Sequence, residues 1–274
     1  MNLPLFIISP EIVTHFRTFH IGNLTFYGYG IIIGIATVTS LILFLRSLWQ
    51  KDRDAIPPTI VVTMISAIAG GRLFYVLGNL GDFTSNLFSV FYLWEGGITI
   101  FGIIFGGIAG NTSCWRLFSM RKKWNHHFFY FLDSALPFVA IGQAIGRWGN
   151  FVNEELYGIP TNQTWGLFVS PQYRVSRYHE YNYFHPAFLY ESALDLFLFL
   201  LLFCVVRRKQ KTALVTGVYA MGYGVIRLLV EFVRYDSTVI WGTLTYSRVG
   251  ALILIFCGIA VLFYANTQDR KQKK

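Results

Sequence analysis

Arginines and carboxylates interrupt the apolar residues in the second half of the sequence, at spacings that suit anion chemistry. Tyr223, Arg227, Glu231 and Arg234 are separated by four, four and three residues, so they share one face of a helix, on which Arg227 and Glu231 can pair. Arg147 closes an earlier apolar segment. Because a guanidinium offers a planar fork of donors that matches phosphate oxygens, these residues predict a site for an anionic, phosphate-bearing ligand.

The elements that position these side chains are predicted to be transmembrane helices. Of the 274 residues, 54% are hydrophobic and 14% are charged, a composition that excludes an ordinary soluble domain. Several apolar stretches approach the roughly 20 residues that a helix needs to cross a bilayer, and the chain has no alternating barrel pattern. We expect an all-α membrane protein, a bundle of about seven transmembrane helices. The expected spans are 25–46, 59–77, 98–116, 127–146, 187–206, 213–232 and 247–265.

The distribution of positive charge predicts the orientation of this bundle. The segments after the first, third, fifth and seventh spans hold most of the 23 basic residues, including every lysine. The positive-inside rule therefore places the N-terminus outside and the C-terminus in the cytoplasm. Residues 1–274 are expected to form a single polytopic membrane domain. Its non-membrane parts are an external N-terminal segment (1–24), an external loop region (147–186) and a basic cytoplasmic tail (266–274).

This orientation brings polar side chains of four spans to the outer layer of the bilayer, where they are costly unless paired or functional. Arginines outnumber carboxylates among them, which predicts a shared polar cavity with positive charge left for a ligand. The alternative is a set of buried ion pairs that fix helix packing. We expect that structural role for the deeper acids Asp133 and Asp195. The outer-layer residues are Arg72 in the second span, Arg147, Asn150 and Asn153 at the end of the fourth, His185, Tyr190 and Glu191 at the start of the fifth, and Tyr223, Arg227, Glu231 and Arg234 in the sixth.

Other sequence features exclude several chemistries. Cys114, Cys204 and Cys257 lie inside predicted spans at no metal-ligand spacing, so we expect neither a disulfide nor a metal site. The net charge of +9 is concentrated between spans, which indicates membrane topology and not nucleic-acid binding. The glycines at 70–71 and 102–110 lack the context of a nucleotide fingerprint and are interpreted as sites of close helix packing. We expect no cofactor, no nucleic-acid partner and a monomer.

One segment carries a longer and more specific pattern. Residues 146–158, GRWGNFVNEELYG, closely resemble the signature of the prolipoprotein diacylglyceryl transferases. Further matches follow in the family's order and cover nearly the whole chain. They are WEGG at 94–97, HP at 185–186, LYE at 189–191, and GYG at 222–224 with Arg227, Glu231 and Arg234. The resemblance implies seven spans with an external N-terminus, in agreement with the charge distribution.

The resemblance implies an enzyme of the bacterial cell membrane whose active site faces the outer leaflet. Such an enzyme transfers the sn-1,2-diacylglyceryl group of phosphatidylglycerol to the lipobox cysteine thiol of a prolipoprotein. A thioether forms and glycerol 1-phosphate is released, which is the first step of lipoprotein maturation. Arg147 would bind the lipid phosphate and Arg227 would assist the reacting phosphate, because pre-placed guanidinium groups stabilise charge in a poorly hydrated site. The implied catalytic residues are Arg147, Arg227, Tyr223, Glu191 and His185, and the implied substrate-binding residues are Arg147, Asn150, Asn153, Glu155, Tyr190, Arg72, Glu231 and Arg234.

The chain departs from the family's pattern at Phe101, where the family usually has a histidine. Phenylalanine cannot transfer a proton, whereas a cysteine thiol with a pKa of about 8.5 attacks well only as a thiolate. Either the arginine field with water suffices, or Glu191, Glu155 or His185 is the base, or the activity is weak. The alternative functions are an inactive, lipid-binding paralogue and a transporter of anionic lipid. A CDP-alcohol phosphatidyltransferase is disfavoured, because the sequence has no cluster of metal-binding aspartates.

Overall fold

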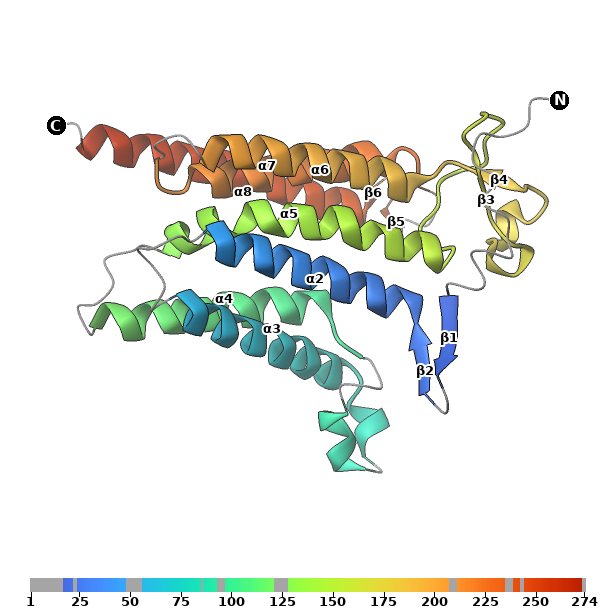
Figure 1. Cartoon of the computed structure of the whole chain (residues 1–274), viewed down its shortest axis with the longest axis horizontal. Helices are drawn as coiled ribbons and strands as arrows, with labels where there is room; N and C mark the ends of the chain where they lie inside the picture. Colours follow the sequence, from blue (N-terminus) through green and yellow to red (C-terminus); the bar gives the residue numbers. More distant parts are fainter. Residues whose placement is uncertain are drawn as a thin grey trace. The chain divides into compact units, whose positions relative to one another are not determined.

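Seven long helices dominate the part of the chain that the structure describes (Figure 1). The computed structural model describes residues 17–21, 24–47, 56–84, 86–92, 97–120, 128–206, 211–234, 239–241 and 244–272. The helices are α2 (Gly28–Ser47), α3 (Ile56–Gly78), α4 (Ile100–Met120), α5 (Phe128–Val152), α6 (Ala187–Val206), α7 (Leu214–Glu231) and α8 (Tyr246–Gln272). Each of the expected spans overlaps one of these helices.

The helices have the length and composition of membrane spans. Six are long and apolar enough to cross a bilayer, and the apolar part of α4, Phe101–Cys114, is shorter. A helix satisfies its own backbone hydrogen bonds, which is why a chain this apolar adopts helices where no water is available. Large exposed hydrophobic side chains such as Ile35, Leu73 and Phe197 line their outer surfaces, as expected for contact with lipid. The predicted multi-pass helical membrane protein is thereby confirmed.

Short elements connect the helices. Three antiparallel pairs are formed by β1 (Thr18–Ile21) with β2 (Leu24–Tyr27), β3 (Leu167–Phe168) with β4 (Tyr183–Phe184), and β5 (Val239–Trp241) with β6 (Leu244–Thr245). Single 3₁₀ turns are η1 (Leu80–Phe83), η2 (Leu87–Phe91), η4 (Pro171–Tyr173) and η5 (Ser176–Tyr178).

The predicted end of the fourth span was wrong by six residues. It was placed at residue 146, just before Arg147, but α5 continues to Val152. The helix continues because Arg147 finds a carboxylate partner on a neighbouring helix, so its charge does not have to leave the bundle. Arg147 and Asn150 therefore lie on α5 and not in the loop that follows it.

Several predictions fall outside the described residues. These are the basic clusters at 51–53, 121–123, 207–209 and 273–274, together with Trp94 and Glu95 of the family-like segment. The charge-based orientation of the chain consequently stays a prediction.

The chain divides into two compact units. The first comprises residues 1–47 and 132–274, and the second residues 48–131. In the first unit α6, α7 and α8 pack side by side (Figure 1). Their core is formed by Ala140, Ala187, Leu198, Leu202, Val215, Ile226 and Val230. Helix α2 packs on α5, with the rings of Phe44 and Phe138 5.8 Å apart.

One partly buried carboxylate of the first unit has a purely structural set of partners. Asp133 on α5 accepts hydrogen bonds from the backbone N–H of Ala213 at 2.6 Å, from the N–H of Thr216 at 2.8 Å and from the Thr216 hydroxyl at 2.6 Å. It therefore caps the N-terminus of α7 from a neighbouring helix and supplies acceptors for orphan backbone donors. The structural role expected of Asp133 agrees with these contacts.

The loop between α5 and α6 is held by its own small core. Tyr157, Val169 and Phe184 are buried together, and the Tyr157 hydroxyl donates to the Tyr173 carbonyl at 2.7 Å and accepts from the Val175 N–H at 3.0 Å. Such a core gives the loop a defined structure without long secondary elements.

A buried carboxylate fixes the start of this loop. Glu154 accepts from the backbone N–H of Ser170 at 2.5 Å and from the Ser170 hydroxyl at 3.1 Å. Glu154 and Leu156 have φ values of +52° and +53°, a region that L-residues adopt only when their surroundings impose it. The part of the family-like segment that follows α5, residues 153–158, is therefore a turn that the loop core and this carboxylate hold in place.

In the second unit, α3 and α4 pack through glycines. A Cβ atom on Gly70 would overlap the Gly102 carbonyl oxygen, and one on Gly106 would overlap the Ser66 carbonyl oxygen. Such contacts let two helix backbones approach closely, as small residues do in membrane interfaces. The interpretation of these glycines as sites of close packing is supported, and no nucleotide-binding role is needed to explain them.

This packing predicts a position-specific loss of stability. Gly106→Ala should lower the free energy of unfolding by about 1–3 kcal/mol, because the added methyl forces two helix backbones apart. Gly107→Ala is the matched control, since a Cβ there would lie 3.6 Å from the Ala67 methyl, at ordinary contact distance. Thermal unfolding of both purified variants in detergent measures the difference, and equal stabilities would contradict the proposed contact.

Candidate functional site

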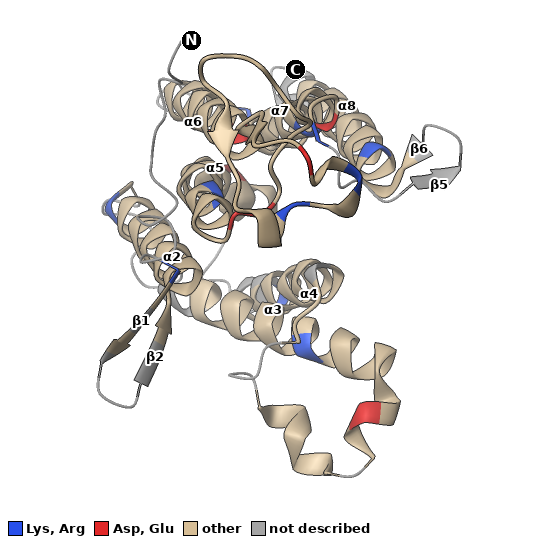
Figure 2. Ribbon diagram, turned by 90° about the vertical axis from the view of Figure 1, so that its right-hand side faces the viewer, with Lys and Arg blue, Asp and Glu red and all other residues tan. Residues whose placement is uncertain are grey.

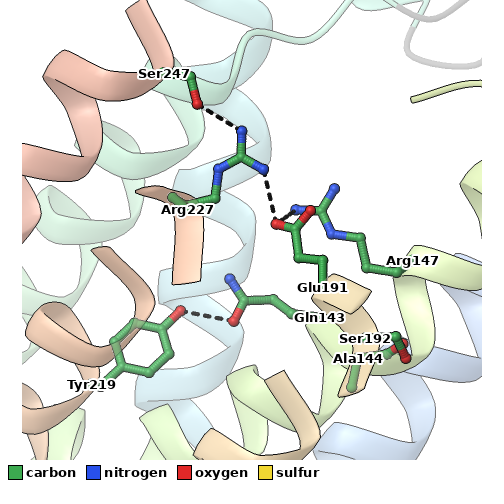
Figure 3. Close-up of polar contacts among 8 residues, drawn as sticks. All are labelled: Gln143, Ala144, Arg147, Glu191, Ser192, Tyr219, Arg227 and Ser247. Atoms are coloured by element: carbon green, nitrogen blue, oxygen red, sulfur yellow. Dashed lines mark hydrogen bonds and ion pairs between the residues drawn. The ribbon is translucent and has the colours of Figure 1, made fainter. Parts of the chain in front are cut away.

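The centre of the first unit is a carboxylate shared by two arginines (Figure 3). Glu191 Oε1 accepts from Arg147 Nη2 at 2.5 Å and from Arg227 Nη1 at 2.9 Å. Arg227 Nη2 also donates to the Ser247 hydroxyl at 2.9 Å. The three charged side chains come from α5, α6 and α7, and Ser247 lies in the first turn of α8. Four helices therefore converge on one polar cluster.

Burial makes this cluster unusual for a membrane helix bundle. The Glu191 side chain is 3% exposed, whereas the Arg147 and Arg227 side chains are 19% and 16% exposed. Charged groups removed from water need direct ionic partners. Two guanidinium groups share a single carboxylate, so the three side chains carry a net charge of one positive unit. That surplus, together with the partial exposure of both arginines, suits an anionic ligand.

Further polar side chains lie one and two helical turns before the arginines on the same helices. Gln143 precedes Arg147 by one turn on α5, and Tyr219 and Tyr223 precede Arg227 on α7. Tyr219 donates to Gln143 Oε1 at 3.1 Å (Figure 3), and the two tyrosine rings stack with centroids 5.9 Å apart. Tyr223 was predicted as a site residue. Gln143, Tyr219 and Ser247 were missed, because each is an ordinary residue until its neighbours are known.

A hydrogen-bonded aromatic group lies at the start of α6. The Tyr190 hydroxyl accepts from Trp165 Nε1 at 2.8 Å and is 3.1 Å from His185 Nδ1. Burial lowers the pKa of His185 below its ordinary value, because desolvation disfavours the charged imidazolium. His185 is therefore neutral at pH 7 and carries one nitrogen that can accept a proton. Trp165, from the middle of the loop, is a second residue that the sequence did not indicate.

The amide and carboxylate after Arg147 pair with each other. Asn150, in the last turn of α5, donates from Nδ2 to Glu155 Oε1 at 2.8 Å. The Asn153 backbone N–H closes the end of the helix on the Gly149 carbonyl at 3.0 Å. Asn150 and Glu155 thus lie at the same end of α5 as Arg147, whereas the backbone contact of Asn153 is structural.

Arg227 and Glu231 do not form the pair that their spacing suggested. Arg227 turns to Glu191 and Ser247, whereas Glu231 accepts from the Thr245 hydroxyl at 2.5 Å. The reason is tertiary, because α6 supplies a carboxylate that competes with the one on the same helix. The backbone of Arg234 forms a bridge with Gly158, which ties the end of α7 to the loop.

Arg72 belongs to the second unit and has a different environment. Its guanidinium donates to the carbonyls of Ser89 at 2.6 Å, Val90 at 2.8 Å and Gly97 at 3.2 Å. It therefore holds together the connection between α3 and α4. The expected collection of polar residues from four spans is found for α5, α6 and α7, while Arg72 organises the backbone of its own unit. Phe101, the second residue of α4, is 68% exposed.

An apolar pocket adjoins the charged cluster. It is lined by Trp148, Phe151, Trp165, Leu167, Pro186, Phe188 and Leu189. Phe151 lies one turn beyond Arg147 on α5, and Phe188 lies nearly one turn before Glu191 on α6. The rings of Phe151 and Phe188 are 5.0 Å apart. The site thus joins an arginine pair for an anion to a surface for an apolar group.

Charged positions among α5 to α8 and the α5–α6 loop are visible along the bundle axis (Figure 2). Among the described residues, no three His, Cys, Asp or Glu side chains form a group that could hold a metal ion. The site combines the positive charge of two arginines, the neutral imidazole of His185 and an apolar pocket. Those groups can bind an amphiphilic anion and stabilise charge that develops on it.

The fold and site define a multi-pass membrane protein with a buried arginine–carboxylate centre. Residues 17–264 match the family model for prolipoprotein diacylglyceryl transferase, and the chain belongs to this family. Curated relatives named phosphatidylglycerol–prolipoprotein diacylglyceryl transferase include the proteins of Synechococcus elongatus (35% identical, covering 89% of this chain and 85% of the relative), Thermosynechococcus vestitus (35%, 92% and 93%) and Thermotoga maritima (33%, 97% and 90%).

The shared carboxylate leads to a stability prediction. Glu191→Gln should lower the free energy of unfolding by about 3 kcal/mol, because it leaves two partly buried guanidinium groups without their anionic partner. Glu180→Gln, at an exposed loop position, is the control for the chemical change itself. Thermal unfolding without added anionic lipid provides the measurement. A Glu191→Gln protein as stable as the control would show that the ion pairs contribute little.

Proposed function

We propose that this protein transfers the diacylglyceryl group of phosphatidylglycerol to the lipobox cysteine thiol of prolipoproteins. The observation that carries the proposal is the pair Arg147 and Arg227, held by one carboxylate, in a chain that belongs to this transferase family. The products are a thioether-linked prolipoprotein and glycerol 1-phosphate.

The arginine pair suits the bond that breaks in this reaction. The thiolate sulfur attacks the glyceryl carbon that carries the phosphate, the carbon–oxygen bond breaks, and its electron pair passes to the phosphate oxygen. The leaving glycerol phosphate gains negative charge, which two pre-placed guanidinium groups stabilise. Without lipid, Glu191 keeps both guanidinium groups oriented. The lipid phosphate then competes with Glu191 for their donors.

The thiol proton needs an acceptor other than residue 101. Protonation of Glu191 would break both of its ion pairs, and Glu155 Oε1 is already engaged by Asn150. We infer that His185 is the better acceptor, because its neutral imidazole can take up the proton without breaking an ion pair. Burial lowers the pKa of His185, so the imidazolium would release that proton readily after transfer. After transfer, the imidazolium returns the proton to solvent or to the leaving phosphate, which balances the reaction.

The charge distribution of the sequence supports a location in the bacterial cell membrane, with the site toward the outer leaflet. The lysines at 51, 122, 123, 209, 211, 271, 273 and 274 would then lie on the cytoplasmic side. Phosphatidylglycerol would enter from the outer leaflet, and the lipobox cysteine would reach the same level at the outer end of its signal segment. The alternative of a lipid-binding, inactive paralogue rests on Phe101.

The proposal predicts cysteine-dependent transfer. The purified protein, mixed with phosphatidylglycerol labelled in its acyl chains and a lipobox peptide, should label the peptide and release glycerol phosphate in equal amounts. A Cys→Ala peptide should remain unlabelled. Arg147→Ala and Arg227→Ala should each reduce turnover by about 100-fold or more, the range found for the loss of one charge-stabilising donor.

Arg177→Ala is the matched control, because Arg177 is exposed in the loop and its guanidinium lies over the Tyr178 ring. It should turn over like the wild type. If Arg147→Ala or Arg227→Ala is folded and equally active, that arginine has no part in stabilising the leaving phosphate. Lipid binding without any transfer by the wild-type protein would favour the inactive paralogue.

The unusual residue at position 101 yields a separate prediction. Phe101→His should maintain or raise the rate of transfer, because the phenyl ring is exposed and an imidazole adds a group that can accept the thiol proton. Initial rates at several pH values measure the effect, with Phe101→Leu as the non-titratable control. A large loss in Phe101→His alone, at unchanged stability, would show that an aromatic hydrocarbon is required there.

A further inference from the structure

A second carboxyl group lies beneath the arginine pair without a hydrogen-bond partner. Asp195 is 0% exposed and follows Glu191 by one turn of α6. Neither of its carboxyl oxygens has a hydrogen-bond partner among the described residues. Asp133, the other deep acid, accepts three hydrogen bonds. The structural role expected for both acids therefore fits Asp133 and leaves Asp195 unexplained, and an unsatisfied buried polar group in a native protein calls for an explanation.

The surroundings of Asp195 offer charge but no direct contact. The groups that act on it electrostatically are Glu191 on its own helix, Arg147 on α5, and Arg227, Tyr219 and Tyr223 on α7. Both arginines donate to Glu191, and Arg227 donates also to Ser247. Tyr219 directs its hydroxyl to Gln143. Asp195 is thus close enough to influence the arginine pair, yet it is not one of the pair's ionic partners.

An ionised Asp195 would be strongly disfavoured in this position. A buried carboxylate without donors loses its hydration and gains no hydrogen bonds in return. The negative charge of Glu191, one turn away, adds repulsion. A neutral carboxylic acid avoids both costs. We propose that Asp195 carries a proton in the resting protein and thereby keeps the arginine site at a net charge of one positive unit.

This charge determines which ligand fits. Two arginines and one glutamate sum to one positive unit, which matches the single negative charge of a phosphodiester. An ionised Asp195 would cancel that surplus and remove the site's electrostatic preference for an anionic lipid. Asp195 is therefore a positioning and specificity-determining residue that acts through the arginine pair. The identity of the anion rests on the function proposed above.

Thermodynamic linkage makes the inference measurable. If anion binding and protonation of Asp195 favour each other, the affinity for the anion must fall as pH rises and Asp195 loses its proton. Between roughly pH 5.5 and 8.5, we expect the affinity of the full-length protein for phosphatidylglycerol to fall by about fivefold or more. The lipid is titrated into protein held in phosphatidylcholine nanodiscs, and binding is followed by a fluorescent phosphatidylglycerol.

The variants separate Asp195 from other titrating groups. Asp195→Asn keeps the shape of the side chain but cannot ionise, so its affinity should no longer fall with pH. Asp195→Glu restores a titratable carboxyl and should restore the fall. Asp82→Asn, at an exposed position of η1, is the matched control and should keep the wild-type slope. An Asp195→Asn protein with the full wild-type slope would overturn the proposal.

Infrared spectroscopy tests the proton without relying on a variant's affinity. The wild-type protein near neutral pH should show the carbonyl stretch of a protonated carboxylic acid, shifted by deuterium exchange and weakened at high pH. That band should be missing from Asp195→Asn, and its persistence there, or its absence from the wild type, would overturn the inference.

Transfer to the lipobox peptide is measured separately. Transfer with pH-independent binding defeats only this inference, and pH-dependent binding without transfer defeats only the proposed function.

Discussion

The ion pairs of Glu191 with Arg147 and Arg227 are the interaction on which the rest of the first unit depends. Each of the three residues comes from a different helix; Glu191 is buried and both arginines are largely buried. Neither arginine could remain at this depth without an anion, and the carboxylate could not remain without a cation. The three helices are consequently held in one register, because sliding one past another by a turn would leave charges unpaired.

The neighbouring features can be understood from that constraint. Gln143 precedes Arg147 by one helical turn, and Tyr219 precedes Arg227 by two. The two side chains form a hydrogen bond with each other. Asp133, nearer the start of α5, caps α7 and fixes where that helix begins. Polar groups in a membrane bundle must find partners within the protein. Asp195 is the exception along this line, and for that reason it is the residue from which we infer a protonated group.

The site also reconciles rigidity with ligand exchange. A buried carboxylate that holds two guanidinium groups pre-organises them at little reorganisation cost when a phosphate arrives. The same carboxylate weakens binding, because the phosphate must compete with it for donors. For the proposed lipid substrate, the apolar pocket beside Trp148 and Phe151 would supply binding energy that does not depend on this competition. An anionic amphiphile would then use both parts, whereas an inorganic anion would use only the first.

What the sequence by itself determined was the class of structure and the kind of chemistry. Hydrophobic stretches of membrane length and the positions of Arg147, Glu191 and Arg227 within them were sufficient to predict a helical membrane protein with an anion site, since burial of apolar length and the cost of charge in lipid are local properties. Only the tertiary structure decided which charges meet. Arg227 pairs with Glu191 on another helix and not with Glu231 on its own, and Arg72 binds backbone carbonyls of its own unit. Of two similar deep acids, Asp133 finds donors and Asp195 finds none. Partner choice depends on helix packing and register across long sequence separations, and helical spacing within a single segment does not contain that information.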